Sequence, residues 1–345
     1  MIQSLNRILV IRRDNIGDLI CTTPLLSQLR ETYPSAQVDV LVNSYNYDVI
    51  ALNPDVNNVY VYTKVKHREH NQSLWSVIWQ RFQLIRELRS QHYDAIILAG
   101  GFSKHAEKLA KQIRSPMIIG MPPVETKSSI INHPTHVPLA LHEVEQTSCL
   151  LIALGIEPRP QCLTLYYDPI LYDQYKQRLT KQSWYSSRPV IGLHISARKV
   201  DQRWPAEYFV ELVQQLYTQH NYQFLLFWSP GDETNKHHPG DDQKAQAIIN
   251  ALSSQIPLLA YTTKKLRELI AAMNLCDAFI CSDGGAMHIA AGLGKPIVCF
   301  FGSSDAQRWH PWGVPHRVIQ SDSRQVIDIN PIQVRDALEF LNIKG

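Results

Sequence analysis

The segment from Arg12 to Asp18 brings acidic and basic side chains to the end of a short apolar run. It reads Arg-Arg-Asp-Asn-Ile-Gly-Asp and leads into a predicted helix. Gly17 permits a tight turn, and Asp18 falls at the start of the helix, where its carboxylate can accept the proton of an attacking hydroxyl group. The alternative is a structural carboxylate that the helix dipole stabilises. We therefore expect Asp18 to be a general base or a helix-terminal acid.

A second segment, 282–288, has the composition of a phosphate cradle. It reads Ser-Asp-Gly-Gly-Ala-Met-His and lies between an apolar run and a predicted helix. Gly284 and Gly285 let the backbone approach a ligand closely, and the N–H groups at a helix start favour a phosphate. Asp283 is expected to cap this helix, and His288 lies one turn in, where it can donate to a phosphate oxygen. The alternative is an ordinary strand-to-helix connection with a buried histidine.

Three further predicted strands in the second half of the chain also end in polar loops. These loops carry Ser196, Arg198, Gln202 and Arg203 after 190–194, Asp232 and Glu233 after 224–228, and Gly302 after 297–301. Hydroxyl and guanidinium groups suit phosphate oxygens, and a carboxylate beyond a strand suits ribose hydroxyls. Each residue alone is more simply a surface group, such as a solvated acid at Glu233. The prediction of a nucleotide site therefore depends on the loops converging on one ligand.

Motifs that are missing narrow the chemistry. Neither Gly-x-Gly-x-x-Gly nor Gly-x-x-x-x-Gly-Lys-Ser/Thr occurs, which argues against dinucleotide and P-loop chemistry. No Asp-x-Asp triplet occurs either, so the carboxylate pair that would hold a divalent ion on a sugar diphosphate is missing. We therefore expect no metal and no resident cofactor. The helix start, His288 and arginines would meet the charge of a leaving diphosphate.

Two basic clusters in the first half could bind an anionic acceptor. They are Lys64, Lys66 and Arg68 after one predicted strand, and Lys104, Lys108 and Lys111 at helical spacing after another. Solvated surfaces are the simpler explanation of such runs. A phosphorylated or acidic sugar lipid is the functional alternative.

The composition is that of a globular chain. The net charge of +3 is too small to indicate a nucleic-acid partner. The six cysteines are scattered, with no Cys-x-x-Cys pair, and are best explained as buried free thiols. No apolar run approaches the ~18 residues of a membrane span, and none resembles a signal-peptide core. These features predict a cytoplasmic protein.

Short apolar runs alternate with amphipathic segments in two series, the pattern of parallel strands joined by helices. The first has strands at 7–11, 38–42, 59–62 and 95–98 and helices near 18–32, 75–90, 104–113 and 142–154. The second has strands at 190–194, 224–228, 278–281 and 297–301 and helices near 206–219, 243–253, 264–274 and 285–293. A last helix is expected at 332–341.

A chain of 345 residues also exceeds the ~250 at which single cores stop growing. Pro158, Pro160 and Pro169 mark a linker between the two series. We therefore expect α/β domains at 1–165 and 166–325, with a closing helical segment at 326–345. Because ligands of open parallel sheets bind beyond the carboxyl ends of the strands, we expect the site in a cleft between the domains.

With these residues in view, the chain resembles glycosyltransferase family nine, the ADP-heptose lipopolysaccharide heptosyltransferases. The resemblance is carried by 12–24 with its Ile-Gly-Asp core, by 196–205, by 282–288 and by 300–304, in order over nearly the whole chain. The Asp-Gly-x-x-x-His segment is specific only in combination with the N-terminal Gly-Asp. The resemblance implies a GT-B architecture of two facing Rossmann-like domains, with the donor on the C-terminal domain and the acceptor on the N-terminal one.

The activity that the resemblance implies is inverting, metal-independent transfer of heptose from ADP-heptose to an inner-core lipopolysaccharide or lipooligosaccharide. Asp18 matches the proposed base, with Arg12 and Gly17 beside it on the acceptor side. The residues Asp283, Gly284, Gly285 and His288 match the segment that holds the diphosphate. Lys104 matches an acceptor-side position, and Glu233 or Asp232 matches the ribose carboxylate.

The partners implied by the resemblance are a nucleotide sugar and a lipid-linked glycan acceptor, which would bring the protein to the inner membrane leaflet. One departure from the family is Gln202, where members commonly carry a lysine two residues before the Trp-Pro pair; Arg203 or Arg198 is expected to replace that charge. The departure leaves open a transferase of the same fold with another donor or acceptor. A sugar-nucleotide epimerase and a non-catalytic nucleotide or glycan binder are the alternatives from other classes.

Overall fold

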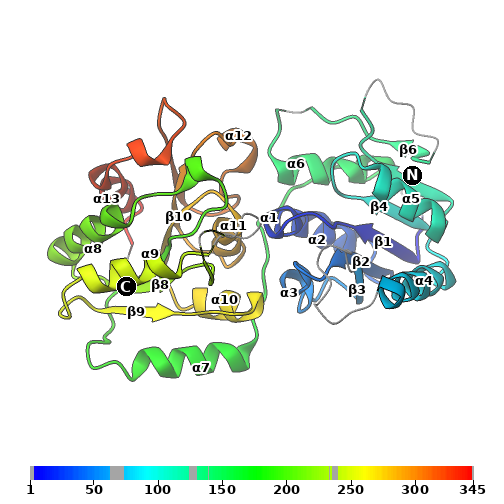
Figure 1. The fold of residues 1–345 in the computed structure, drawn as a ribbon. Helices are drawn as coiled ribbons and strands as arrows, with labels where there is room; N and C mark the ends of the chain where they lie inside the picture. Colours follow the sequence, from blue (N-terminus) through cyan, green and yellow to red (C-terminus); the bar gives the residue numbers. More distant parts are fainter. Residues whose placement is uncertain are drawn as a thin grey trace. The chain divides into compact units, whose positions relative to one another are not determined.

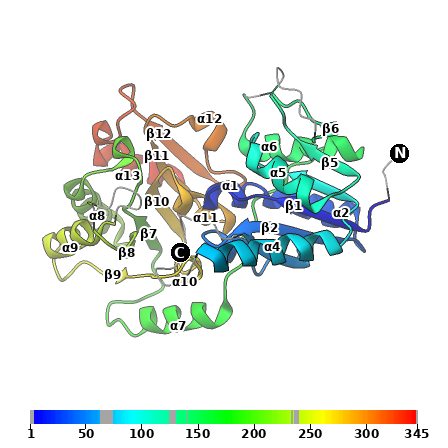
Figure 2. The same cartoon turned by 45° about the vertical axis from the view of Figure 1, so that its right-hand side comes forward.

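The computed structural model describes residues 4–62, 74–123, 130–138, 140–232, 234 and 240–343. The chain divides into two compact units, Met1–Leu165 and Tyr166–Gly345. Figures 1 and 2 show a strand-and-helix arrangement within each unit.

The first unit is built on a parallel sheet. Its strands are β1 (Arg7–Ile11), β2 (Gln37–Asn43), β3 (Asn58–Tyr62), β4 (Ala95–Leu98), β5 (Met117–Gly120) and β6 (His133–Pro134). Its helices are α1 (Ile16–Ile20), α2 (Thr23–Thr32), α3 (Tyr47–Ile50), α4 (Leu74–Ser90), α5 (Lys104–Ile113) and α6 (Glu143–Ser148), followed by the 3-10 helix η2 (Cys149–Leu154). The strands lie in the order β3-β2-β1-β4-β5-β6.

The second unit repeats this plan. Its strands are β7 (Val190–His194), β8 (Gln223–Phe227), β9 (Leu258–Tyr261), β10 (Ala278–Ser282), β11 (Ile297–Phe301) and β12 (His316–Gln320), in the order β12-β11-β10-β7-β8-β9. Its helices are α7 (Pro169–Thr180), α8 (Ala206–His220), α9 (Asp242–Ala251), α10 (Leu266–Met273), α11 (Gly285–Gly292), α12 (Ala306–Trp309) and α13 (Pro331–Phe340), with 3-10 helices η3 (Val200–Gln202) and η4 (Val326–Asp328).

The central strands are buried on both faces. In the first unit, Leu9 of β1 packs in one cluster with Leu88 of α4 and Leu109 of α5. The neighbouring Ile8 and Val10, which point to the opposite face, are also 0% exposed. Burial on both faces explains why these strands read as continuous apolar runs, and it confirms the predicted α/β class.

Both sheets have the doubly wound strand order, in which the order reverses between two neighbouring strands. The reversal lies between β1 and β4 in the first unit and between β7 and β10 in the second. In sheets of this order, the loops after the two strands run to opposite faces, and ligands bind where they separate. The segments 12–18 and 283–285, singled out in the sequence, follow β1 and β10.

Some elements differ from the expectation. The helix expected near 18–32 is two helices, α1 and α2, and Pro24 falls in the first turn of α2, where a missing N–H donor costs little. Pro169 is the first residue of α7, with the Asp168 side chain capping it, rather than part of the linker. The terminal helix α13 belongs to the second unit, whose core contains its Val334 and Leu338.

Candidate active site

A buried arginine organises the loop after β1. Arg12 is 1% exposed, and its Nη2 donates to Asp18 Oδ1 at 2.8 Å and to Glu143 Oε1 at 2.7 Å. Its Nη1 donates to the carbonyl of Ala99, and its Nε lies 3.3 Å from Asp14 Oδ2. These contacts join the loops after β1 and β4 to the first turn of α6, and they fix the Asp18 carboxylate in one orientation.

Arg12, which is predicted to contact the acceptor, is buried in this structure and contacts three carboxylates of its own unit. Burial opposes its charge, but the attraction of Glu143, Asp18 and Asp14 outweighs this and raises the pKa of the guanidinium. Arg12 therefore stays charged beneath Asp18 and positions it. The tight turn predicted at Gly17 is wrong, because Gly17 is buried within α1, where its carbonyl accepts from the amide of Cys21.

Asp18 has the helix-terminal position that the sequence predicted, and the geometry of its carboxylate is compatible with the predicted role of a base. Its Oδ2 accepts hydrogen bonds from the backbone N of Asn15 at 3.2 Å and from Asn15 Nδ2 at 3.0 Å, which closes a capping box at the start of α1. Its side chain is 17% exposed, so part of the carboxylate reaches the surface. Burial raises its pKa, but Arg12 and the bonds from Asn15 outweigh burial and leave the pKa below its usual value. Asp18 is thus ionised at neutral pH and oriented, as a proton acceptor must be.

In the second unit, Gln202 joins the loops after three strands. It is 4% exposed, and its Nε2 donates to Asp283 Oδ2 at 2.8 Å and to Ser304 Oγ at 2.7 Å. Its backbone carbonyl accepts from Ser282 Oγ at 2.7 Å. The loops after β7, β10 and β11 therefore meet by direct contact at Gln202.

The predicted cap at Asp283 is wrong. The N-cap residue of α11 is Gly284, with φ 156° and no side-chain hydrogen bond to the helix start, because the Asp283 carboxylate accepts from Gln202 instead. The first N–H groups of α11, from Gly285 onward, are thus left without a side-chain cap, which suits a phosphate ligand. His288 lies in this helix, 3% exposed, with its ring edge-on to Trp309 at 6.1 Å.

Lys199, an exposed cation that is absent from the residues predicted above, contacts this junction. Its Nζ lies 3.3 Å from Ser304 Oγ, the oxygen that also accepts from Gln202. Arg203 is turned into its own loop, where Nε donates to the carbonyl of Ala197 at 3.1 Å, and Arg198 is exposed. The sequence feature that could have indicated Lys199 is its position directly before the short segment that ends at Gln202.

Gly302 has a packing role at this junction. A Cβ on Gly302 would lie 2.6 Å from Asp201 Oδ2 and 2.7 Å from the Asp201 carbonyl oxygen. The next residue, Ser303, donates its backbone N–H to Asp201 Oδ2 at 2.7 Å. Glycine therefore lets the loop after β11 approach η3 closely.

The loop after β8 lies beside Ser196, whose Oγ accepts from the backbone N of Ser229 at 2.9 Å. Asp232 is fully exposed and accepts from the backbone N of Thr234 at 2.7 Å. The remaining candidates Glu233, Lys64, Lys66 and Arg68 lie outside the described residues. Lys104 is described, exposed at the first position of α5.

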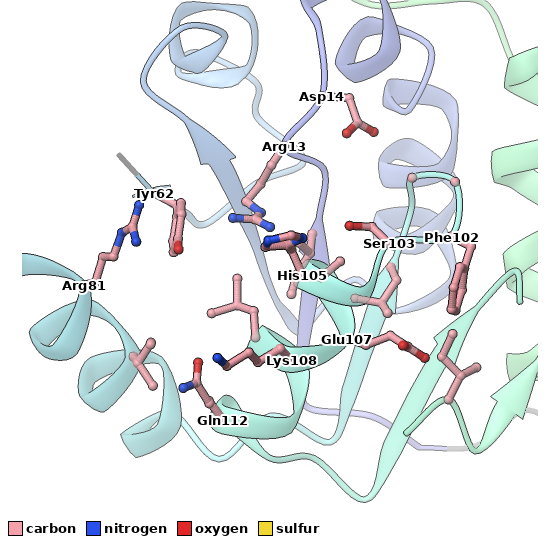
Figure 3. A pocket seen from close by; sticks show the side chains of 18 of the residues that line it. Arg13, Asp14, Tyr62, Arg81, Phe102, Ser103, His105, Glu107, Lys108 and Gln112 are labelled. Carbon is pink, nitrogen blue, oxygen red and sulfur yellow. The ribbon is translucent and has the colours of Figure 1, made fainter. Parts of the chain in front are cut away.

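The first unit also contains a cavity of about 760 Å³ beside the end of β1, between α4 and α5 (Figure 3). Lys108 of the predicted basic repeat lines it, together with Arg13, Asp14, Tyr62 and Arg81. Within the described part of the chain, no cluster of three or more His, Cys, Asp or Glu side chains could hold a metal ion. No helix that the structure describes is both long and apolar enough to cross a membrane.

Comparison with known families decides the class of the protein. The model of glycosyltransferase family 9 (heptosyltransferase) matches residues 81–330, which is more than half of the chain. The chain belongs to glycosyltransferase family 9. The predicted family and enzyme class, a heptosyltransferase-like glycosyltransferase, are thereby confirmed. The matched range begins after Asp18, so the role of Asp18 depends on the geometry described above.

Curated relatives are similar to this chain over most of their own length. Lipopolysaccharide heptosyltransferase 3 of Escherichia coli is 26% identical over 312 residues, which cover 86% of this chain and 83% of the relative. Lipopolysaccharide heptosyltransferase 2 of Escherichia coli strain K12 is 27% identical over an alignment of 369 positions, gaps included, which covers 97% of this chain and 98% of the relative.

Solved structures confirm the GT-B fold. The family 9 glycosyltransferase from Veillonella parvula DSM 2008 superposes with a TM-score of 0.81 at 22% identity, covering 100% of this chain and 99% of that one. The ADP-heptose heptosyltransferase II of E. coli has a TM-score of 0.76 at 23% identity, covering 97% and 98%. The E. coli heptosyltransferase WaaC with ADP has a TM-score of 0.79 at 18% identity, covering 97% and 99%.

Proposed function

We propose that this glycosyltransferase moves a heptose from ADP-heptose to an inner-core lipopolysaccharide or lipooligosaccharide, with inversion at the anomeric carbon and without a metal ion. The observation that carries the proposal is the oriented, ionised Asp18 at one switch point together with the uncapped start of α11 at the other. The names of the relatives support the reaction, and structures of the E. coli enzyme with ADP and with ADP-2-deoxy-2-fluoro heptose support the donor.

Asp18 acts as the general base in this mechanism. The acceptor oxygen attacks the anomeric carbon from the face opposite the diphosphate, the bond from that carbon to the diphosphate oxygen breaks, and the hydroxyl proton moves to the Asp18 carboxylate. A single displacement of this kind inverts the anomeric centre. Because Arg12 and Asn15 lower the pKa of Asp18, the carboxylate is a weak base, and the proton moves late, once the new bond has made the hydroxyl acidic.

The leaving ADP is stabilised by fixed donors rather than by Mg²⁺. The backbone N–H groups at the start of α11 meet the diphosphate, and His288 adds a donor from the same helix. Gln202 holds the Asp283 carboxylate without adding charge, so we assign the compensating positive charge to Lys199, which contacts the same Ser304 hydroxyl. This assignment replaces the expectation that Arg198 or Arg203 stands in for the family lysine.

A lipid-linked acceptor requires the protein to work at a membrane surface, and α4 supports peripheral contact. Its Trp79 is 60% exposed, and Ile78 and Phe82, which also line the cavity between α4 and α5, are 53% and 56% exposed. We expect the protein to sediment with vesicles that contain anionic lipid. A Trp79→Ser variant, which leaves the cavity lining unchanged, should sediment less, and equal sedimentation of the two proteins would remove α4 from this role.

The epimerase alternative is not favoured, because the matched family and the relatives are heptosyltransferases. A transferase with another donor is the alternative that Gln202 keeps open. A thermal-shift series with ADP, UDP, GDP and CDP distinguishes an ADP-heptose donor from another nucleotide sugar, since a ligand at ~100 times its Kd adds about 2.7 kcal/mol of stability. Selective stabilisation by ADP supports the proposal; a preference for another nucleotide contradicts the donor assignment.

A further inference from the structure

Two arginines hold the ring of Tyr62 between them in the cavity of the first unit. The guanidinium carbon of Arg13 lies 4.4 Å from the ring centroid, and that of Arg81 lies 4.7 Å from it. Figure 3 shows the two side chains approaching the ring from opposite sides, Arg13 from the loop after β1 and Arg81 from α4. Tyr62 ends β3, so three separate elements build this arginine clamp.

The clamp brings two positive charges to one side of the cavity. Nε of Arg13 is buried and has no hydrogen-bond partner among the described residues. Burial lowers the pKa of Arg13, and the charge of Arg81 lowers it further, against the opposing effects of Tyr62 and Asp14. Asp14 is itself shared with Arg12, from whose Nε it lies 3.3 Å. An anion entering the cavity would relieve the repulsion and supply the missing acceptor.

The remaining lining suits a sugar that carries such an anion. Lys108 and His105 of α5 add basic groups, and Ser103 adds a hydroxyl. Glu107 of α5 is an acidic lining residue, but it is buried, with 8% of it exposed. Phe102 adds an aromatic ring against which a sugar can pack. A volume of about 760 Å³ lies within the ~300–1,000 Å³ range of small-molecule sites, which includes sugar-sized ligands.

We propose that this cavity binds a phosphate monoester carried by the acceptor glycan, with Arg13 and Arg81 as its ligands. The inference rests on the proposed function, because it assigns the cavity to the acceptor. A phosphate monoester is close to a dianion at neutral pH and has three terminal oxygens, so it can pair with both guanidiniums, whereas a carboxylate neutralises one. Asp14, which lines the cavity, contacts Arg12, and Arg12 contacts Asp18, so a chain of ion pairs links the cavity wall to the proposed base.

Direct binding tests the clamp without requiring turnover. The protein is first saturated with ADP, so that phosphate cannot enter the donor cradle, and is then titrated by calorimetry with glucose 6-phosphate, glucuronate and glucose. We expect glucose 6-phosphate to bind most tightly. Arg81→Gln should weaken its binding by about tenfold or more, the range for a charged hydrogen bond, and Arg81→Lys should fall between the two.

The matched control is Arg86→Gln, an exposed arginine on the same helix that does not line the cavity. It should leave sugar phosphate binding at the wild-type level, and the thermal unfolding of every variant reports whether it folds. Equal binding of glucuronate would overturn the phosphate assignment. Unchanged binding of glucose 6-phosphate in both Arg81→Gln and Arg13→Gln would overturn the clamp.

A second readout links the clamp to the reaction. With a phosphorylated inner-core acceptor and its phosphatase-treated form, we expect wild type to prefer the phosphorylated acceptor and Arg81→Gln to lose that preference through a higher KM. Transfer that ignores the acceptor phosphate in wild type refutes the inference while the proposed function stands. Clamp-dependent binding of glucose 6-phosphate in a protein that transfers no heptose refutes the proposed function while the anion site stands.

Discussion

Replacement of Asp18 by asparagine separates its role as a base from its role in the fold. The wild-type carboxylate accepts from Arg12 through Oδ1 and twice from Asn15 through Oδ2. The amide that Asp18→Asn introduces would retain one acceptor oxygen and turn an NH₂ group toward a donor. Arg12 keeps its 2.7 Å contact with Glu143, so the loop should stay folded.

The two effects of Asp18→Asn have different sizes. Loss of a charged hydrogen bond costs about 1.5–3 kcal/mol of stability, which a chain of this size tolerates. Loss of a general base lowers kcat by about 10²–10⁴, equivalent to ~2.7–5.4 kcal/mol of transition-state stabilisation. Affinity for ADP should not change, since the nucleotide contacts proposed above all lie in the second unit.

The assay is single-turnover release of ADP from ADP-heptose in the presence of an inner-core acceptor, with ADP affinity measured separately. Asp48→Asn is the matched control, because Asp48 is also an aspartate in the first turn of a helix of the same unit, α3. It should retain turnover within about twofold, since it lies outside the Arg12 network. A folded Asp18→Asn enzyme whose kcat stays within about tenfold of wild type would refute the reasoning.

Three further predictions concern the second unit. Gln202→Lys places a cation beside Asp283 and should lower the Kd for ADP, measured by calorimetry, several-fold. An unchanged or higher Kd would show that Lys199 already supplies all the positive charge that the diphosphate uses. Gly302→Ala places a Cβ 2.6 Å from Asp201 Oδ2 and should cost about 1–3 kcal/mol in chemical unfolding, a cost whose absence would mean that the two loops separate freely. Burial lowers the pKa of His194 to about 4, so the unfolded state binds more protons than the folded state between pH 6.5 and 4, and the free energy of unfolding falls by about 2 kcal/mol by pH 5. His194→Asn should flatten this pH dependence in urea unfolding at pH 7 and pH 5. An equally steep dependence in the variant would assign it to other groups.

The strands that the sequence predicts well are those buried on both faces. Strands β1, β4, β7 and β11 have the predicted bounds, because every residue or nearly every residue is apolar and each run ends at a polar loop. The strand β12, His-Arg-Val-Ile-Gln, is half-buried throughout and has no apolar run. Edge strands of this kind are stabilised by pairing with a neighbouring strand, and the sequence of the strand itself does not show that pairing.

The site residues also divide into those that a local sequence pattern predicts and those that depend on distant contacts. Glycine and aspartate at strand ends were visible in the sequence because their backbone requirements are local. Contacts across 81 residues from Gln202 to Asp283, or across 131 residues from Arg12 to Glu143, depend on strand order. For this reason the sequence predicted Asp283 as a cap and did not show the Arg12–Glu143 pair or the Arg13–Tyr62–Arg81 clamp.

The central claim is acceptor-dependent transfer of heptose from ADP-heptose, and one reaction tests it most directly. The purified protein is incubated with ADP-heptose, with and without a phosphorylated inner-core acceptor and in the presence of a chelator, and the glycan is analysed by mass spectrometry and by NMR of the new anomeric centre. The account predicts one added heptose of inverted configuration and ADP release only when acceptor is present. ADP-heptose consumed without acceptor, a retained configuration, or an acceptor of unchanged mass would contradict it.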